Sequence, residues 1–243
     1  MSKTVITLSA LYDLCLDRFD VHRVLVIAPL RVARDTWPAE IQKWDHLKGL
    51  TWSVAVGTAQ ERLAALRQKT FLHIINRENV QWLIEDSGIR WEYDMIVIDE
   101  LSSFKSHQAK RFRSLLKVRP GVKRIVGLTG TPSSNGLMDL WAEFRLLDMG
   151  KRLGRFITHY RDQFFMPDAR NMNQIFSYKP RPGAEAEIYR RIGDICVSMR
   201  AADHLKMPER VDNVVEISLS SREEKLYRQM ERDMLLPYAD GDV

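Results

Sequence analysis

The chain of 243 residues is 45% hydrophobic and 28% charged, which supports a folded core and excludes a disordered segment. Its 37 Lys and Arg against 32 Asp and Glu give a net charge of +5, which is compatible with a nucleic-acid partner. Cys15 and Cys196 match no metal-ligand spacing, so we expect neither zinc nor a disulfide framework. The longest apolar run, residues 24–30, is too short to cross a bilayer. With no export signal evident, we expect no membrane association and a cytoplasmic location.

Five short runs of apolar and β-branched residues predict strands, at residues 24–28, 51–56, 71–75, 95–98 and 124–128. Segments with helical periodicity lie before and between these strands and after the last, at residues 4–16, 34–44, 59–67, 79–85, 108–116 and 137–147. Apolar strands that alternate with amphipathic helices are typical of a parallel sheet with helices on both faces. We therefore expect residues 1–148 to form one α/β domain.

The pattern changes after residue 148. Residues 149–210 mix basic and aromatic side chains without clean periodicity and include one predicted helix, at 184–192. We interpret this region as a helical protrusion or linker. In residues 211–243 we expect a strand over 211–219, followed by a helix that begins at Ser220 or Ser221.

Aromatic residues of the protrusion could stack on nucleic-acid bases or pack into a core. Phe156, Tyr160 and Phe164 are spaced four residues apart, and Phe165 follows them. This spacing places the first three on one helix face, which favours burial over stacking on bases. For the same kind of reason we expect interior positions for His73 and for Trp37, Trp44, Trp82 and Trp141.

Two motifs stand at the ends of neighbouring predicted strands. Asp99 and Glu100 follow the fourth strand, at the edge where open α/β folds bind ligands. There a first carboxylate can hold Mg²⁺ and a second can activate water, although this motif alone favours an ordinary solvated loop. The fifth strand runs into Thr129-Gly-Thr131-Pro, whose hydroxyls can bond to acidic groups or phosphates. The two motifs together are more specific than either one alone, and they indicate that this edge of the sheet carries a functional site.

A third motif, Ser2-Lys3-Thr4, immediately precedes a predicted amphipathic helix. It is similar to the end of a phosphate-binding loop, G-x-x-x-x-G-K-[ST]. In such loops the Lys reaches the phosphates, the Thr hydroxyl binds Mg²⁺, and N–H groups at the helix start cradle the anion. Ser2 stands where the final Gly is usual, and the glycine-rich part would lie before residue 1.

These motifs resemble the first motor lobe of the Swi/Snf-like branch of superfamily-two helicases, in the compact form carried by bacteriophages and prophages. The matching stretches are, in order, residues 3–8, 26–32, 75–80, 97–105 and 128–141. Residues 205–208 and 211–219 resemble the path towards a second lobe. The resemblance implies an α/β fold: a RecA-like P-loop NTPase lobe with a mostly parallel sheet between helices, plus a small helical or irregular C-terminal extension.

The resemblance also implies a function, ATP hydrolysis with Mg²⁺ that is stimulated by duplex DNA and coupled to translocation along it. The implied nucleotide contacts are Ser2, Lys3 and Thr4. The implied Mg²⁺ ligands are Thr4 and Asp99, and the catalytic carboxylates are Asp99 and Glu100. The residues implied to couple the state of the bound nucleotide to DNA binding are Thr129, Gly130 and Thr131. The implied contacts to the DNA backbone are Pro29, Leu30, Arg31 and Lys105.

A second RecA-like lobe, in cis or in trans, supplies the arginine finger in this family, and such a finger can be worth about 10³–10⁵ in rate. We therefore expect the chain to be incomplete on its own. We expect a cytoplasmic location for it, as a protein encoded by a bacterial host or by a phage. The alternatives are a non-hydrolysing DNA-binding or partner-docking remnant, a metal-dependent nuclease that uses Asp99 and Glu100, and a restriction-system motor subunit. Residues 135–141 favour the Snf-like branch among the motors.

Positive charge is concentrated in residues 105–124, at Lys105, Lys110, Arg111, Arg113, Lys117, Arg119, Lys123 and Arg124. Such a stretch could form a surface for the phosphate backbone, with salt-dependent and sequence-independent binding. For any single residue of the stretch, a position on a solvated helix face is the favoured interpretation.

Overall fold

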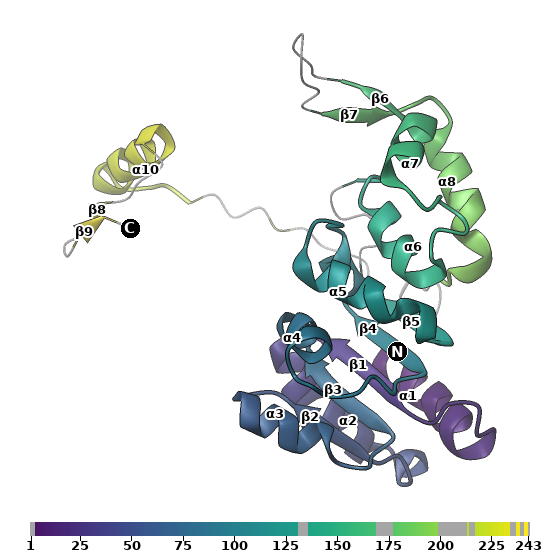
Figure 1. Cartoon of the computed structure of the whole chain (residues 1–243). Helices are drawn as coiled ribbons and strands as arrows, with labels where there is room; N and C mark the ends of the chain where they lie inside the picture. Colours follow the sequence, from purple (N-terminus) through teal and green to yellow (C-terminus); the bar gives the residue numbers. More distant parts are fainter. Residues whose placement is uncertain are drawn as a thin grey trace. The chain divides into compact units, whose positions relative to one another are not determined.

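The structure, a computed structural model, describes residues 3–130, 136–168, 177–198, 213, 217–233, 237–238 and 241–242. It consists of two compact units, residues 1–198 and residues 199–243 (Figure 1). The first unit contains the five-stranded sheet and most of the helices. The second contains helix α10 (Ser221–Asp233) and an antiparallel pairing of β8 (Pro237–Tyr238) with β9 (Gly241–Asp242).

The sheet of the first unit is entirely parallel. Its strands lie in the order β2 (Trp52–Ala55), β3 (Leu72–Asn76), β1 (Val24–Ala28), β4 (Met95–Asp99) and β5 (Arg124–Leu128). Every residue of β1 and β3 is buried, because parallel strands connected by helical crossovers are covered on both faces. The parallel α/β fold predicted from the sequence is thereby confirmed.

Helices cover both faces of the sheet (Figure 1). Side chains of β1 alternate between two apolar clusters, with Leu25 and Ile27 in one and Val24 and Val26 in the other, as the period of two in a strand requires. The first cluster includes α3 (Ala59–Leu66), α4 (Val80–Glu85) and α5 (Lys110–Val118). The second includes α1 (Lys3–Tyr12) and α2 (Trp37–Lys43).

Short turns of other helical types join these elements. The π-helical turns are η1 (Asp13–Asp17), which continues α1, and η2 (Val32–Thr36), which leads into α2. The 3₁₀ turns are η3 (Asp45–Leu47), η4 (Arg77–Asn79), η5 (Leu101–Phe104) and η6 (Arg119–Gly121). The segments predicted as continuous helices at residues 4–16 and 34–44 are therefore each divided into an α-helix and a π-helical turn.

Three further helices follow the sheet within the first unit. They are α6 (Leu140–Asp148), α7 (Ile157–Phe164) and α8 (Ala184–Ile192), the last continued by η7 (Gly193–Ile195). Between α7 and α8, β6 (Phe165–Pro167) pairs with β7 (Tyr178–Pro180) in an antiparallel hairpin. The buried apolar side chains of these helices belong to the apolar cluster on the α3–α5 face of the sheet.

The expected burial of aromatic residues is confirmed with one correction. Tyr160, Phe164 and Phe165 are buried, and the Tyr160 hydroxyl donates to the carbonyl of Leu137 over 2.7 Å. The prediction was wrong for Phe156, which is 57% exposed. Phe156 precedes the first residue of α7, so the helix spacing used to predict its burial does not apply to it.

His73 and the tryptophans occupy the interior positions expected of them. Trp37 and Trp141 are buried, and Trp44 and Trp82 pack against the core clusters. His73 is buried on β3, with Nε2 at 3.0 Å from the carbonyl of Gln68 and Nδ1 at 2.7 Å from the Tyr93 hydroxyl. Burial lowers the pKa of His73, so the neutral ring donates through Nε2 and accepts from Tyr93.

Arg119 belongs to the basic stretch, but it is buried rather than solvated. Its guanidinium donates to the carbonyls of Leu146 over 2.5 Å, Leu147 over 2.7 Å and Val122 over 2.9 Å. Two of these carbonyls lie in the last turn of α6, where a helix has unpaired acceptors and a partial negative charge. Arg119 therefore connects the start of η6 to the end of α6.

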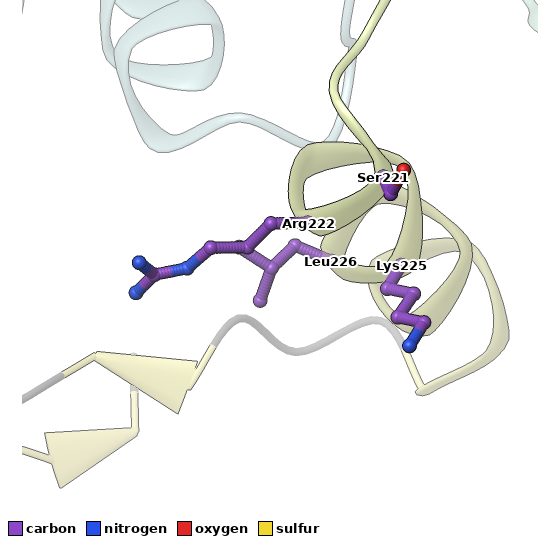
Figure 2. A pocket seen from close by; sticks show the side chains of 4 residues that line it. All are labelled: Ser221, Arg222, Lys225 and Leu226. Atoms are coloured by element: carbon purple, nitrogen blue, oxygen red, sulfur yellow. The ribbon is translucent and has the colours of Figure 1, made fainter.

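In the second unit, the helix predicted after Ser220 is confirmed. The Ser220 hydroxyl accepts from the N–H of Glu223 at 3.4 Å, and the Ser220 N–H donates to the Glu223 carboxylate at 2.8 Å, which is a capping box. Most of the strand expected at 211–219, and all of 205–208, lie outside the described residues. The described residues of the first range, 213 and 217–219, are not in a strand. A shallow pocket runs along α10, lined by Ser221, Arg222, Lys225 and Leu226 (Figure 2).

Candidate functional site

The carboxyl ends of the five parallel strands meet at one edge of the sheet, and the predicted site residues follow three of these ends. Asp99 is the last residue of β4 and Glu100 comes next. Thr129 and Gly130 directly follow β5, and Pro29 directly follows β1. Since β4 pairs with β1 on one side and β5 on the other, the three segments are neighbours at this edge.

Glu100 adopts a left-handed backbone conformation, with φ 63° and ψ 66°. A residue other than glycine rarely adopts this conformation and keeps it only where its surroundings hold it. Here the Ser102 hydroxyl donates to Oε1 of Glu100, and the Thr129 hydroxyl donates to the same oxygen over 3.3 Å. The turn therefore directs the Glu100 carboxylate towards the end of β5.

Asp99 is fixed by a different contact. The indole Nε1 of Trp37, at the start of α2, donates to Oδ2 of Asp99 over 2.9 Å. Trp37 is fully buried, so it holds the carboxylate rotamer rigidly. Trp37 was predicted as a core residue, and its contact with Asp99 had no signal in the sequence.

Lys3 and Thr4 begin α1, and Lys3 reaches the end of β5. Its Nζ donates to the carbonyl of Thr129 over 2.5 Å, and a methyl group added at Gly130 would lie 4.0 Å from the same nitrogen. The Thr129 carbonyl thus accepts a hydrogen bond from Lys3, and the Thr129 hydroxyl donates one to Glu100. Thr4 is buried beside Lys3.

The structure thereby brings together the Lys3, Glu100 and Thr129 side chains that the sequence motifs predicted to be neighbours. Ser2 and Thr131 lie outside the described residues. Thr4 and Asp99 offer a hydroxyl and a carboxylate, which are hard oxygen donors of the kind that Mg²⁺ prefers. The residues present therefore fit a nucleotide with Mg²⁺. Across the described ranges, no group of three or more His, Cys, Asp and Glu side chains could hold a metal ion by itself.

The residues expected along DNA lie in two places. Pro29, Leu30 and Arg31 connect β1 to η2, and Leu30 and Arg31 are exposed. Lys105 directly follows η5. Its Nζ lies 3.7 Å from Oδ2 of Asp139, the residue before α6. Lys105 is therefore partly engaged within the first unit, while Arg31 lies at the edge that carries Asp99 and Glu100.

The basic stretch 105–124 is divided by its contacts. Lys117 contacts Glu85 over 2.7 Å, and Arg124 contacts Asp20 over 3.2 Å. The Arg111 guanidinium donates to the carbonyl of Ser103. Hydrogen bonding by Lys117 in particular holds the pKa of Glu85 down at about 2. The residues of the stretch that are exposed are Lys110, Arg113, Lys117, Lys123 and Arg124.

A further carboxyl group near this site was missed. Glu143 on α6 is only 1% exposed, and burial raises its pKa to about 8, with contributions from Asp139 and Glu100 that Lys105 opposes. Its Oε1 has no hydrogen-bond partner in the part of the chain that the structure describes. A signal did exist: Glu143 lies among Leu140, Phe144 and Leu146 on a helix whose other residues are mostly apolar.

A parallel sheet with a Lys-Thr helix start, an Asp-Glu pair and a Thr-Gly turn at its carboxyl edge defines a RecA-like lobe. The SNF2-related domain matches residues 1–242, and the chain belongs to this family. None of the helices in the described residues has the length and apolar character to span a membrane.

Among similar proteins, putative protein p41 of Acyrthosiphon pisum secondary endosymbiont phage 1 is 34% identical over all of this chain and 54% of that protein. Helicase ssl-1 of Caenorhabditis elegans is 28% identical over 93% of this chain and 9% of that protein. The Sulfolobus solfataricus SWI2/SNF2 ATPase core in complex with dsDNA superposes with a TM-score of 0.56, at 25% identity, over 67% of this chain and 32% of that one. The chain thus spans about half the length of the phage relative.

Proposed function

We propose that this chain is the ATP-binding lobe of a DNA-dependent ATPase that couples hydrolysis to movement along duplex DNA, encoded by a phage and acting in bacterial cytoplasm. The observation that carries the proposal is the position of Thr129, which joins Lys3 to Glu100 at the carboxyl edge of the sheet. Support comes from membership of the SNF2-related family and from the likeness to an ATPase core in complex with dsDNA.

The residues divide the chemistry among them. Lys3 and the N–H groups at the start of α1 bind the phosphates, since a helix N-terminus with an ammonium group is an anion site. Thr4 and Asp99 hold Mg²⁺, which when bound neutralises charge on the phosphates. Trp37 keeps the Asp99 carboxylate in one orientation. These contacts bind and orient the nucleotide without forming a covalent bond.

Glu100 is the general base of this proposal. Its carboxylate accepts a proton from the attacking water, and a positioned base contributes about 10²–10⁴ in rate. The hydroxyls of Ser102 and Thr129 hold one carboxylate oxygen, and we assign the other oxygen to the attacking water. Because Thr129 also contacts Lys3, a phosphate that draws Lys3 away changes the surroundings of Glu100. Thr129, Gly130 and Thr131 would in this way couple nucleotide binding to the DNA contact.

The DNA contact is assigned to Pro29, Leu30 and Arg31, together with Lys105, which directly follows η5. A second RecA-like lobe, in cis or in trans, completes the motor with an arginine finger. The alternative function is a DNA-binding or partner-docking remnant that binds no nucleotide. The two proposals differ in nucleotide binding, which is measurable on this chain alone.

The test of nucleotide binding uses calorimetry with ATP and Mg²⁺. We expect Glu100→Gln to bind as the wild type does, and Lys3→Ala to lose binding, because Gln keeps the shape of Glu100 and Ala removes the cation. Lys123→Ala, an exposed lysine before β5, is the matched control and should bind normally. Absence of binding by the wild type, with DNA binding retained, would support the remnant function and refute the ATPase.

Turnover and DNA affinity test the remaining steps. With the second lobe supplied in trans, DNA-stimulated ATP turnover should fall by about 10² or more in Glu100→Gln, and a variant with wild-type turnover would refute the role of Glu100. Arg31→Ala should weaken duplex binding and reduce its salt dependence by about one counterion. Arg90→Ala serves as control, because Arg90 is exposed and precedes β4, at the opposite edge of the sheet.

A further inference from the structure

Phe156 directly precedes α7, and its ring is presented to solvent although the sequence predicted its burial. The side chain is 57% exposed. The guanidinium of Arg155 lies 6.0 Å from the ring centroid. The imidazole of His159, in the first turn of α7, meets the ring nearly at a right angle with centroids 5.6 Å apart. Since Arg155 and His159 are exposed as well, the three side chains form one aromatic and basic cluster on the surface.

A single exposed phenylalanine needs no functional explanation, but the chain offers a comparison that distinguishes this one. Phe19 is also preceded by an arginine and is 68% exposed. Its neighbour Arg18 is paired with Asp13 over 2.7 Å. Arg155, in contrast, forms no hydrogen bond or ion pair with any residue that the structure describes. The same dipeptide thus carries a neutralised cation at one position and an available cation at the other.

The segment that carries the cluster lies beside the first turn of α6. The indole Nε1 of Trp141 donates to the carbonyl of Gly154 over 3.0 Å, two residues before Phe156. Asp139, two residues before Trp141, lies 3.7 Å from the Nζ of Lys105, which is assigned above to the DNA contact. The cluster and Lys105 are therefore held at the same end of α6, next to the region where a nucleic acid is expected.

The chemistry of the cluster identifies its ligand. Residues 149–163 contain four lysines and arginines and one acidic residue, Asp162, so the local charge favours an anion. An exposed aromatic ring beside a cation can stack on a base and bind the adjoining phosphate, which is how proteins bind single-stranded nucleic acids. The bases of a duplex are already stacked on one another and leave no face for the ring. The cluster therefore fits a nucleotide that is not base-paired.

We propose that Arg155, Phe156 and His159 form a binding site for an unpaired nucleotide of DNA, in which the base stacks on Phe156 and the phosphate binds Arg155, while His159 supports the ring from one side. This site goes beyond the proposed function, whose contacts are to the backbone of duplex DNA. A motor lobe on duplex DNA meets such a nucleotide where the duplex opens or ends. Binding at this site requires neither ATP nor a second lobe.

The test is fluorescence anisotropy with two single-stranded probes of equal length, oligothymidylate and an abasic strand that has the phosphates without the bases. Phe156→Ala should weaken binding of oligothymidylate about fivefold or more and leave the abasic strand unaffected, because only a base can stack. Phe156→Trp should retain binding, because it keeps a flat ring. Arg155→Ala should weaken binding of both strands and reduce the slope of log affinity against log salt by about 0.7.

Two controls separate stacking from other effects. Phe19→Ala removes an exposed phenylalanine whose neighbouring arginine is paired, and it should bind both strands as the wild type does. A relaxed circular duplex has no unpaired nucleotide, so the wild type and Phe156→Ala should bind it equally.

Four results would overturn the proposal. They are no binding of oligothymidylate by the wild type, wild-type affinity in Phe156→Ala, an equal loss for oligothymidylate and the abasic strand, and an equal loss for oligothymidylate and the circular duplex. The last would mean that the ring contacts the duplex itself. All these measurements are made without nucleotide, so a failure of the chain to bind ATP would refute the proposed function alone.

Discussion

Arg119 gives the sharpest stability prediction. Replacing it with Met keeps an unbranched side chain of similar length and removes the guanidinium that binds the carbonyls of Val122, Leu146 and Leu147. The backbone acceptors at the end of α6 then lose their donors. We expect Arg119→Met to destabilise the first unit without changing the fold, because the apolar stem is conserved.

The magnitude follows from the three bonds. A buried acceptor left without a donor costs about 1–3 kcal/mol. The variant regains part of this because it no longer buries a cation, whose desolvation already lowers the pKa of Arg119. A net loss of about 3 kcal/mol is expected, a large share of the roughly 5–15 kcal/mol that stabilise a domain. Arg119→Lys should lose about 2 kcal/mol, because one ammonium cannot reproduce the planar fork.

The assay is urea unfolding followed by circular dichroism, with the midpoint compared at constant slope. Arg113→Met is the matched control, since Arg113 is exposed on α5, two turns before Arg119. It should change the free energy of unfolding by no more than about 0.5 kcal/mol. Equal stabilities of Arg119→Met and Arg113→Met would refute the view that Arg119 fastens the end of α6.

Three other variants test contacts around the site. Gly127→Ala places a methyl group 2.5 Å from Cδ2 of Leu101 and should cost about 1–3 kcal/mol; an unchanged thermal midpoint would contradict this. Trp37→Phe removes the indole donor to Asp99 and should weaken binding of ATP with Mg²⁺ about tenfold in calorimetry, whereas wild-type affinity would count against the tether. Glu143 retains in the folded state a proton that the unfolded state releases between pH 4.5 and about 8. The free energy of unfolding of the wild type, relative to that of Glu143→Gln, should therefore fall with rising pH in that window by about 1.4 kcal/mol per unit. The two proteins are compared in urea titrations across the window, and parallel slopes would argue against a buried neutral acid.

The sheet could be predicted because its signals are local. β1 and β5 begin and end at the predicted residues, β2 and β3 differ from the prediction by one residue at each end, and β4 is longer by one residue at its end. The β6–β7 hairpin could not be predicted, because each strand has three residues and exists through its pairing. The π-helical turns were missed for a related reason, since the side-chain periodicity of η1 and η2 continues that of α1 and α2.

In the candidate site, too, the arrangement that follows from the strands could be predicted, and contacts between distant segments could not. Parallel strands share a carboxyl edge, so the sequence sufficed to bring Asp99, Glu100 and Thr129 together. Contacts between distant segments of the chain could not be predicted. The hydrogen bond from the Trp37 indole to Asp99, for example, joins residues 62 positions apart. The burial of Arg119 could not be predicted either, because its positive charge suggested a solvent-exposed position. Nor could the burial of Glu143, which lies on α6 where this helix packs against η5. The functional roles of the assembled residues stay predictions until the variants are measured.

The strand order also constrains how the protein emerges from the ribosome. β1 is made first but lies in the middle of the sheet, where it pairs with β3 through residues 72–76 and with β4 through residues 95–98. A nascent chain that ends before residue 95 therefore leaves one side of an entirely apolar strand unpaired. Such contacts between distant segments form slowly, and exposed strand edges in partly folded chains promote aggregation. The stretch of translation between residues 28 and 98 is thus the interval in which a chaperone that shields extended apolar segments would matter most to this chain.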